Sequence, residues 1–413
     1  MKLCVTTFIF SIVFVSAASF SAIAQTSVND FLLTAFEDRN LATYDDQINF
    51  LKPKRYRLPV IDELEFRISN DELTYDDLQY AIRLNPGNPW KIRRNNALFN
   101  ATKKELSLRK QLEFKDNLFD RYELLLDFLY SKDLSDLIQR ELSIIEKKAT
   151  IFEENFESNL FDAEDFVDVK IDQIDGIQAF DQSLLEMNEN KSKINSILNN
   201  SLFDWASFDI ISVSSIDSIS NEIGATSFSS TELELIAQRA EVARQEVRTE
   251  RADFNLGFIQ SEYAPFRNND DSEIGFSVGI TIPIFRDNRP QIAERILDEI
   301  ELKNEFEIEQ YRDSVEKVLV FEQLKSLIHL HQRVVDQVED LDLEALTVNL
   351  SRSSNYDPLS VLKLERGIVK LDELILKSRQ RVLEQYLEFL FIFDVTSHQP
   401  LTNYLSDRLE NIE

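Results

Sequence analysis

The side chains of this protein that could perform chemistry are three histidines, one cysteine and a large excess of carboxylates. His329 and His331 lie two positions apart in a stretch with helical periodicity, so they point to different faces and are poorly placed to hold one metal ion. His398 stands apart from both, near the end of the chain. The sequence has no glycine-rich phosphate-binding motif and no recognisable catalytic constellation. It therefore predicts a protein without enzyme activity, metal site or cofactor.

One acidic pattern stands above the general excess of carboxylates. Asp165, Asp168, Asp172 and Asp175 follow the spacing i, i+3, i+7 and i+10, which places them on one face of a predicted helix. A solvated helix face explains this stripe as well as a functional surface does. What the stripe could do depends on the elements that position it.

The composition limits the class of protein. The 413 residues include 74 acidic and 45 basic side chains, a formal charge of −29, which argues against a nucleic-acid partner. Only 7 glycines and 9 prolines occur, too few for the turns of an all-β chain, and this favours long helices.

The N-terminal segment has the pattern of a secretory signal peptide. Lys2 precedes the apolar run LCVTTFIFSIVFVSAASF, and Ala22-Ile23-Ala24 provides a small-residue cleavage site. We expect residues 1–24 to be removed; the alternative is an N-terminal membrane anchor. The single cysteine, Cys4, lies in this segment, so no disulfide is expected in the mature chain. No later stretch approaches the ~20 apolar residues of a membrane helix.

Four segments alternate apolar and polar residues, as expected of strands with one apolar and one polar face. They form two predicted hairpins, with strands at about residues 57–69 and 78–85 and at about 252–262 and 274–285. Alternation alone does not say whether the apolar face meets a protein core or lipid. The predicted apolar face consists of Leu58, Val60, Leu64, Phe66, Ile68, Leu78, Tyr80, Ile82, Leu84, Phe254, Leu256, Phe258, Ile274, Phe276, Val278, Ile280 and Ile282.

Nearly all the remaining sequence indicates helices too long for a compact domain. The runs from Lys91 to Asp175 and from Gln291 to Asp357 contain neither glycine nor proline, and their apolar residues recur at coiled-coil spacing. At ~1.5 Å per residue, each run would reach on the order of 100 Å or more as a continuous helix. The layout of hairpin, long helix, polar break and returning helix occurs twice. We therefore predict two repeats, residues 25–230 and 231–413, with residues 199–230 as a side belt.

At this point the residues resemble a known family, the TolC-like outer-membrane efflux proteins. The resemblance rests on GFSVGITIPIF running into RDNRPQIAERILDEIEL, on NYDPLSVLKLERGIVKLDELIL, and on the duplicated layout. It implies a mainly α fold with a small β part. Long antiparallel coiled-coil helices would form a periplasmic tunnel, and each chain of a homotrimer would give four strands to a shared 12-stranded transmembrane β-barrel.

The resemblance also implies a function. It predicts a passive exit duct of a tripartite efflux pump or type I secretion system, in the outer membrane of a Gram-negative bacterium. Its partners would be outer-membrane lipid, a periplasmic adaptor protein and an inner-membrane transporter. The alternative from the residues alone is a periplasmic coiled-coil scaffold without a pore, in which the apolar strand faces are buried in protein.

By this resemblance, the two polar breaks would be the tips of the tunnel and the docking surface for the adaptor; the alternative is that they are only interhelical turns, which use the same small and polar residues. Three symmetry copies of the aspartate stripe would form an acidic constriction at the tunnel mouth, where rings of Asp favour cations. The predicted tip residues are Asn159, Leu160, Phe161, Asp162 and Ala163, with Ser354, Asn355, Tyr356, Asp357, Pro358 and Leu359.

Overall fold

The computed structural model describes residues 27–53, 61–70, 78–156, 163–198, 203, 210–226, 229–254, 256–264, 273–281, 289–351, 358–398 and 400–412. The predicted signal peptide, residues 1–24, lies outside this range. No described helix combines the length and the apolar character needed to cross a bilayer.

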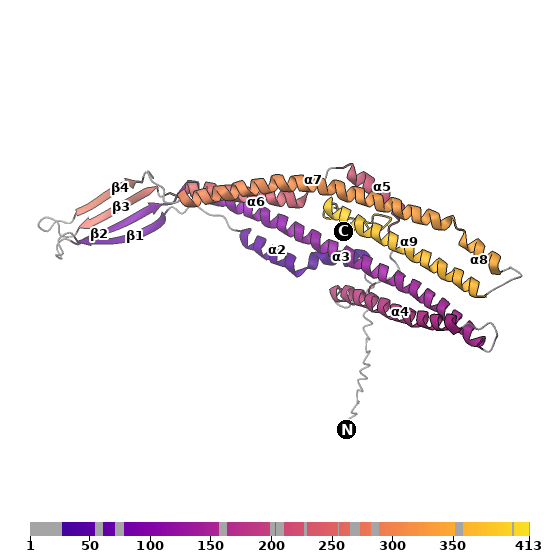
Figure 1. The fold of residues 1–413 in the computed structure, drawn as a ribbon. Helices are drawn as coiled ribbons and strands as arrows, with labels where there is room; N and C mark the ends of the chain where they lie inside the picture. Colours follow the sequence, from indigo (N-terminus) through magenta and orange to yellow (C-terminus); the bar gives the residue numbers. More distant parts are fainter. Residues whose placement is uncertain are drawn as a thin grey trace, which may run out of the picture.

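The molecule is elongated, with a four-stranded sheet at one end and long helices extending from it (Figure 1). This arrangement confirms the predicted fold class for one chain: long antiparallel helices, a small sheet, and an element order that repeats. In chain order the elements are α1 (Val28–Leu33), a 3₁₀ turn (Thr34–Glu37), α2 (Arg39–Leu51), β1 (Ile61–Asn70), β2 (Leu78–Pro86), α3 (Pro89–Glu154), α4 (Ala163–Ile197), α5 (Val213–Gly224), α6 (Thr231–Ala252), β3 (Gly257–Ala264), β4 (Glu273–Ile280), α7 (Arg289–Glu339), α8 (Leu343–Ser351) and α9 (Pro358–Ile392).

The junction between sheet and helices depends on Asn88. Its side-chain oxygen accepts hydrogen bonds from the backbone N–H groups of Trp90 and Lys91, at 3.0 and 3.2 Å, and so caps the N-terminus of α3. Its side-chain nitrogen donates to the carbonyls of Ala252 and Phe254, at 2.8 and 2.9 Å, where α6 ends. Pro89 occupies the first helical turn, where a missing N–H has no consequence. One side chain therefore ties the start of the longest helix to the segment that leads into β3.

The second long helix is shorter than the sequence predicts. The run without glycine or proline continues to Asp357, yet α7 ends at Glu339 and α8 begins at Leu343. Asp342 has a φ of +41° between them, and its carboxylate accepts a hydrogen bond from Ala345 N–H at 3.4 Å. Aspartate tolerates this backbone conformation and caps a following helix, so it interrupts the run without a glycine.

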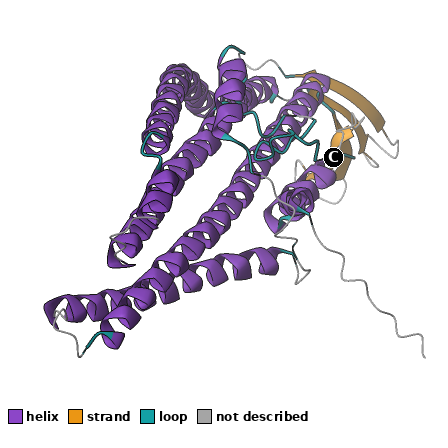
Figure 2. Cartoon of the chain, turned by 90° about the vertical axis from the view of Figure 1, so that its right-hand side faces the viewer, coloured by secondary structure: helices purple, strands orange, loops and turns teal. Residues whose placement is uncertain are grey.

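The helices lie side by side along the long axis (Figures 1 and 2). In this layer α4 packs against α3, α3 against α9, and α9 against α7, while α6 packs against both α3 and α7. The predicted side belt contains α5, which packs on α7 and α9. As a result, α4 and α7 are the lateral members of the layer.

The main core lies near the middle of the molecule, where α1 and the segment after α9 meet the long helices. Its largest fully buried side chains include Tyr122, Tyr386, Phe31 and Phe389. The Tyr122 hydroxyl donates to the carbonyl of Thr402 at 3.2 Å. The core brings together residues from α1, α3, α4, α5, α7, α9 and the C-terminal segment, including Leu32, Leu125, Ile194, Ile216, Leu324, Leu390 and Leu405.

A buried ion pair closes this core. Asp394, fully buried and with a φ of +60°, follows α9 and lies 3.4 Å from the ammonium group of Lys115 on α3. Its carboxylate also accepts hydrogen bonds from Thr231 N–H, at the start of α6, and from the Ser397 hydroxyl, at 2.5 and 2.8 Å. Burial alone would raise the pKa of Asp394, but Lys115 and these hydrogen bonds outweigh it and lower the pKa.

We predict that Asp394→Asn lowers the free energy of unfolding by about 3–5 kcal/mol at neutral pH, because it leaves the Lys115 charge buried without a partner. Since the folded-state pKa of Asp394 is depressed, its stabilisation is present above the unfolded pKa and is lost as the pH falls through the folded value. Urea unfolding followed by circular dichroism measures both effects. Asp181→Asn, at an exposed position of α4, is the control; equal unfolding midpoints for the two variants would contradict the prediction.

Candidate functional site

The four strands form one antiparallel sheet in the order β1-β2-β3-β4, and one of its faces is apolar and exposed. Directly paired residues of an antiparallel sheet share a face, so the register defines rows across all four strands. The exposed fractions reach 73% at Phe66, 79% at Phe276 and 81% at Ile280. The rows are Leu64-Leu84-Ile259-Val278, Phe66-Ile82-Ser261-Phe276 and Ile68-Tyr80-Tyr263-Ile274. We call this surface the apolar sheet face.

The opposite face is polar and carries its own network. The Arg67 guanidinium lies 2.5 Å from the Glu65 carboxylate, and Arg83 lies 3.9 Å from the same carboxylate. The Asn85 side-chain nitrogen donates to Glu63 at 2.9 Å. The sheet is therefore amphipathic across its thickness, as the alternation predicted.

One strand departs from the predicted face. Phe258 lies on the polar side, because it pairs with Gly279 while Ile259 pairs with Val278 on the apolar sheet face. The Phe258 ring packs so closely on Gly279 that an added Cβ there would overlap the ring, and the Arg83 guanidinium lies 3.5 Å from the ring centroid. In β3 the apolar residues of the exposed face are thus Ile259 and Tyr263.

Phe254 and Leu256 also differ from the prediction, because they precede β3 rather than belong to it. The strand begins at Gly257, whose φ of +127° is a backbone conformation that residues other than glycine rarely adopt. Leu58, Val60 and Ile282 lie outside the described residues. The other residues predicted for the apolar face lie on β1, β2 and β4, and they share one face of the sheet as expected.

Both outer edges of this sheet are open. β1 and β4 are the terminal strands of the order, and no other described strand pairs with either. Exposed edges present backbone groups that can accept another strand. A four-stranded sheet with two free edges and an exposed apolar face is incomplete as a water-exposed surface.

At the end of the helices far from the sheet, the predicted aspartate stripe contacts a residue that the sequence analysis did not single out. Arg366, on α9, donates to Asp172 on α4 and to Glu141 on α3, at 2.5 and 2.7 Å. Asp165, Asp168 and Asp175 are exposed on α4. The stripe is therefore not uniform, since Asp172 is neutralised by a cation that bridges three helices.

Of the predicted tip residues, the structure describes three. Ala163 and Pro358 are exposed at the first positions of α4 and α9, and Leu359 packs with Phe166 on a small cluster around Ile145. The other tip residues, Asn159 to Asp162 and Ser354 to Asp357, lie outside the described residues. The start of α4 and the start of α9 thus meet on α3.

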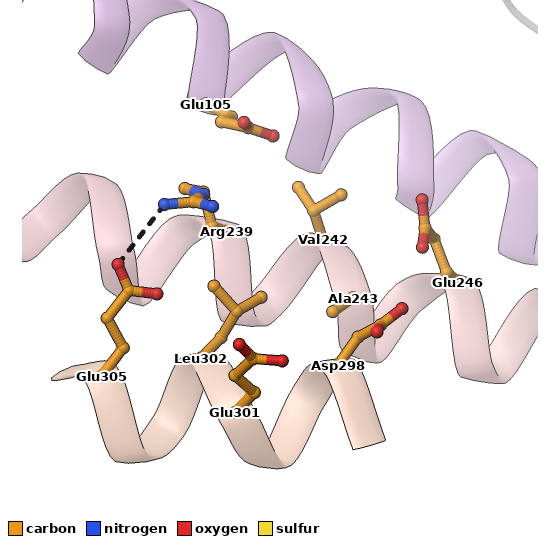
Figure 3. Close-up of a pocket in the computed structure, with 9 residues that line it drawn as sticks. All are labelled: Glu105, Arg239, Val242, Ala243, Glu246, Asp298, Glu301, Leu302 and Glu305. Carbon is orange, nitrogen blue, oxygen red and sulfur yellow. Dashed lines mark ion pairs between the residues drawn. The ribbon is translucent and has the colours of Figure 1, made fainter. Parts of the chain in front are cut away.

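A second charged feature lies nearer the sheet, between α3, α6 and α7 (Figure 3). It is a pocket of about 340 Å³ whose lining is rich in carboxylates, with one ion pair of 3.6 Å between Arg239 and Glu305. The described residues include no group of three His, Cys, Asp or Glu side chains arranged to hold a metal. His331 is buried against the Ser378 hydroxyl at 2.8 Å, and burial lowers its pKa.

Comparisons with known proteins match the fold rather than the sequence. No family model matches the chain, and no curated protein matches it by sequence. The solved structure of the outer-membrane channel OprN is similar, with a TM-score of 0.64 at 11% identity over 89% of each chain. The outer membrane protein VceC from Vibrio cholerae is similar with a TM-score of 0.59 at 13% identity, over 89% of this chain and 95% of that one. The MtrE outer membrane channel of Neisseria gonorrhoeae, in its open state, is similar with a TM-score of 0.60 at 11% identity, over 89% of this chain and 88% of that one. This chain therefore has the fold of these outer-membrane channel proteins, which agrees with the fold that its resemblance to the TolC-like proteins implied.

We predict that Arg366→Gln loosens α4 without unfolding the middle of the molecule. Partly exposed ion pairs are worth about 1 kcal/mol or less, so the loss of two should raise amide exchange over Ala163–Gly176 by about fivefold. Hydrogen exchange read by mass spectrometry measures this change. Arg381→Gln, at an exposed position of α9, is the matched control, and equal exchange in both variants would argue against the bridge.

Proposed function

We propose that this chain is a subunit of a homotrimeric outer-membrane channel that serves as the passive exit duct of an efflux or type I secretion system. The observation that carries the proposal is the apolar sheet face together with the two open edges of the sheet. Three copies would supply twelve strands, and pairing β4 of one chain with β1 of the next would close them into a barrel. A closed barrel satisfies every backbone hydrogen bond inside a bilayer, which an open sheet cannot do.

Lipid is the natural environment of the apolar sheet face in this arrangement. Three rows of large side chains would point outward from the barrel, and the polar network around Arg83 and Glu65 would line its interior. Phe258 would lie inside the barrel, against the wall at Gly279. Among the described strand residues, the interior would then combine charged groups with the aromatic ring of Phe258.

The helices support the same assembly. The lateral helices of the layer, α4 and α7, carry exposed apolar residues that a neighbouring copy would cover. On α7, Tyr311 is 74% and Leu297 66% exposed, and on α4 Leu185 is 68% and Ile174 65% exposed. Contact between α4 of one chain and α7 of the next would close the helices into a tunnel.

The far end of the helices would be the periplasmic mouth, opened by an adaptor and an inner-membrane transporter that supplies the energy. The tip residues would meet the adaptor. Asp165, Asp168 and Asp175 would give the mouth a preference for cations, with Asp172 contributing least because Arg366 neutralises it. A periplasmic scaffold without a pore would instead bury the apolar sheet face in protein.

Substitutions on the two faces of β4 separate these functions. We predict that Phe276→Arg destabilises the barrel by about 2–4 kcal/mol per chain, the cost of a cation on the lipid face near the membrane midplane. The outer-membrane fraction should then lose the heat-modifiable trimer, as judged by electrophoresis with and without heating in detergent.

Ser277→Arg is the matched control, because Ser277 is the next residue and points to the polar face. This variant should keep the trimer. The same contrast is expected in β3 between Ile259→Arg, which should fail to assemble, and Gln260→Arg, which should assemble. A trimer that tolerates Phe276→Arg and Ile259→Arg would contradict the lipid assignment.

A further inference from the structure

A second pocket, at the far end of the helices, has the opposite charge from the rest of the protein. It measures about 490 Å³ and lies between α3 and α9, beside the start of α4. Four cationic side chains line it, Lys148, Lys363, Arg366 and Lys370, and a single carboxylate, Asp165. In a chain with a formal charge of −29, such a concentration of positive charge around one cavity is unexpected.

Most of these cations are not neutralised by the protein. Arg366 is engaged by Glu141 and Asp172, but none of the three lysines forms an ion pair in the described part of the chain. Lys148 is half-buried, with its ammonium group 5.9 Å from the centroid of the Phe152 ring. Lys363 and Lys370 are exposed at the mouth of the pocket. A half-buried cation without a counter-ion, with two further cations beside it, favours an anionic ligand, because the local dielectric constant is lower than that of water.

Apart from Ser360 and Gly367, the remaining lining of the pocket is apolar. It consists of Ile144, Ile145, Phe152, Leu359 and Leu362, on α3 and α9. A volume of this size, with an apolar wall and a few charged groups, is typical of sites for small organic ligands. An inorganic anion would leave the apolar wall unfilled.

Gly367, on α9, is a lining residue of the pocket with open space beside it. It lines the pocket in the middle of a helix, and an added Cβ would find no atom within 4 Å. A larger side chain at this position would project into the cavity, and replacing a glycine inside a helix does not by itself destabilise the helix. The pocket can therefore be filled from within the chain by one substitution.

We infer that this pocket binds a small amphipathic organic anion, with a carboxylate or sulfonate facing the lysines and an apolar ring or chain against Phe152 and Leu362. A bound anion would link α3 to α9 at the end where the predicted tips lie. The inference goes beyond the channel assignment and does not depend on it, because binding is measured without transport.

The test uses the full mature chain in detergent and three probes of the same shape: 2-naphthalenesulfonate, the neutral 2-naphthalenemethanol and the cationic 2-naphthylmethylammonium. Equilibrium dialysis should show saturable binding of the sulfonate at one site per chain, weakened by added salt. The neutral and cationic probes should bind at least tenfold more weakly. Equal binding of all three, or no saturable binding of the sulfonate, would overturn the inference.

Two matched pairs of variants locate the site. Lys148→Gln should weaken sulfonate binding about fivefold, whereas Lys147→Gln, at the adjacent exposed position outside the pocket, should leave it unchanged. Gly367→Phe should abolish binding and Gly367→Ala should retain it, with unchanged circular dichroism in both. Identical affinities within both pairs would mean that the sulfonate binds elsewhere, and would reject the pocket.

Discussion

The structure depends on one constraint: its sheet has an exposed apolar face and two outer edges that need partners. Four strands expose three rows of mostly large apolar side chains on one face, while the outer edges of β1 and β4 pair with no other described strand. Neither feature is stable in water, because apolar surface and open edges both promote association. A bilayer would accept the apolar face but not the open edges, so an environment of lipid requires partner strands as well. Identical copies would satisfy both requirements with one interface repeated by symmetry.

The rest of the chain can be understood as the means of holding that sheet at the end of a long helical layer. Asn88 joins the start of α3 to the end of α6, so the two hairpins enter the helices at one fixed junction. Far from the sheet, Asp394 connects the end of α9, the start of α6 and Lys115 on α3 inside the main core. Arg366 makes a third connection, between α3, α4 and α9, at the opposite end. The middle connection is buried and strong, whereas the one at the far end is partly exposed and weak. In the proposed channel, this difference would allow the far end of the helices to open while the middle stays rigid.

Sequence periodicity predicted the elements better than their partners. The alternation in β1, β2 and β4 identified strands and the residues that share a face, and the scarcity of glycine and proline identified the long helices. In β3 two adjacent residues, Phe258 and Ile259, are both apolar, so the alternation does not show which of them lies on the apolar sheet face. Gly279 leaves room for the Phe258 ring on the polar face, and Ile259 therefore lies on the apolar one. The break before α8 was missed because Asp342, rather than a glycine, adopts the positive φ. The contacts of Arg366 with Asp172 and of Lys115 with Asp394 join residues far apart in the chain, and periodicity shows only which face a residue occupies, not what it meets.

The most direct test of the central claim is whether β1 of one chain lies beside β4 of another. In a Cys4→Ser background, Glu65→Cys on β1 can be combined with Gly275→Cys or Ser277→Cys on β4, so that neighbouring registers are sampled. Within one chain these strands are separated by three strand spacings, about 14 Å, beyond the ~7 Å that a disulfide can bridge. Oxidation in the outer-membrane fraction should therefore give a covalent trimer that reduction returns to monomer. A product that remains monomeric in all combinations would contradict the closure of the sheet by neighbouring copies.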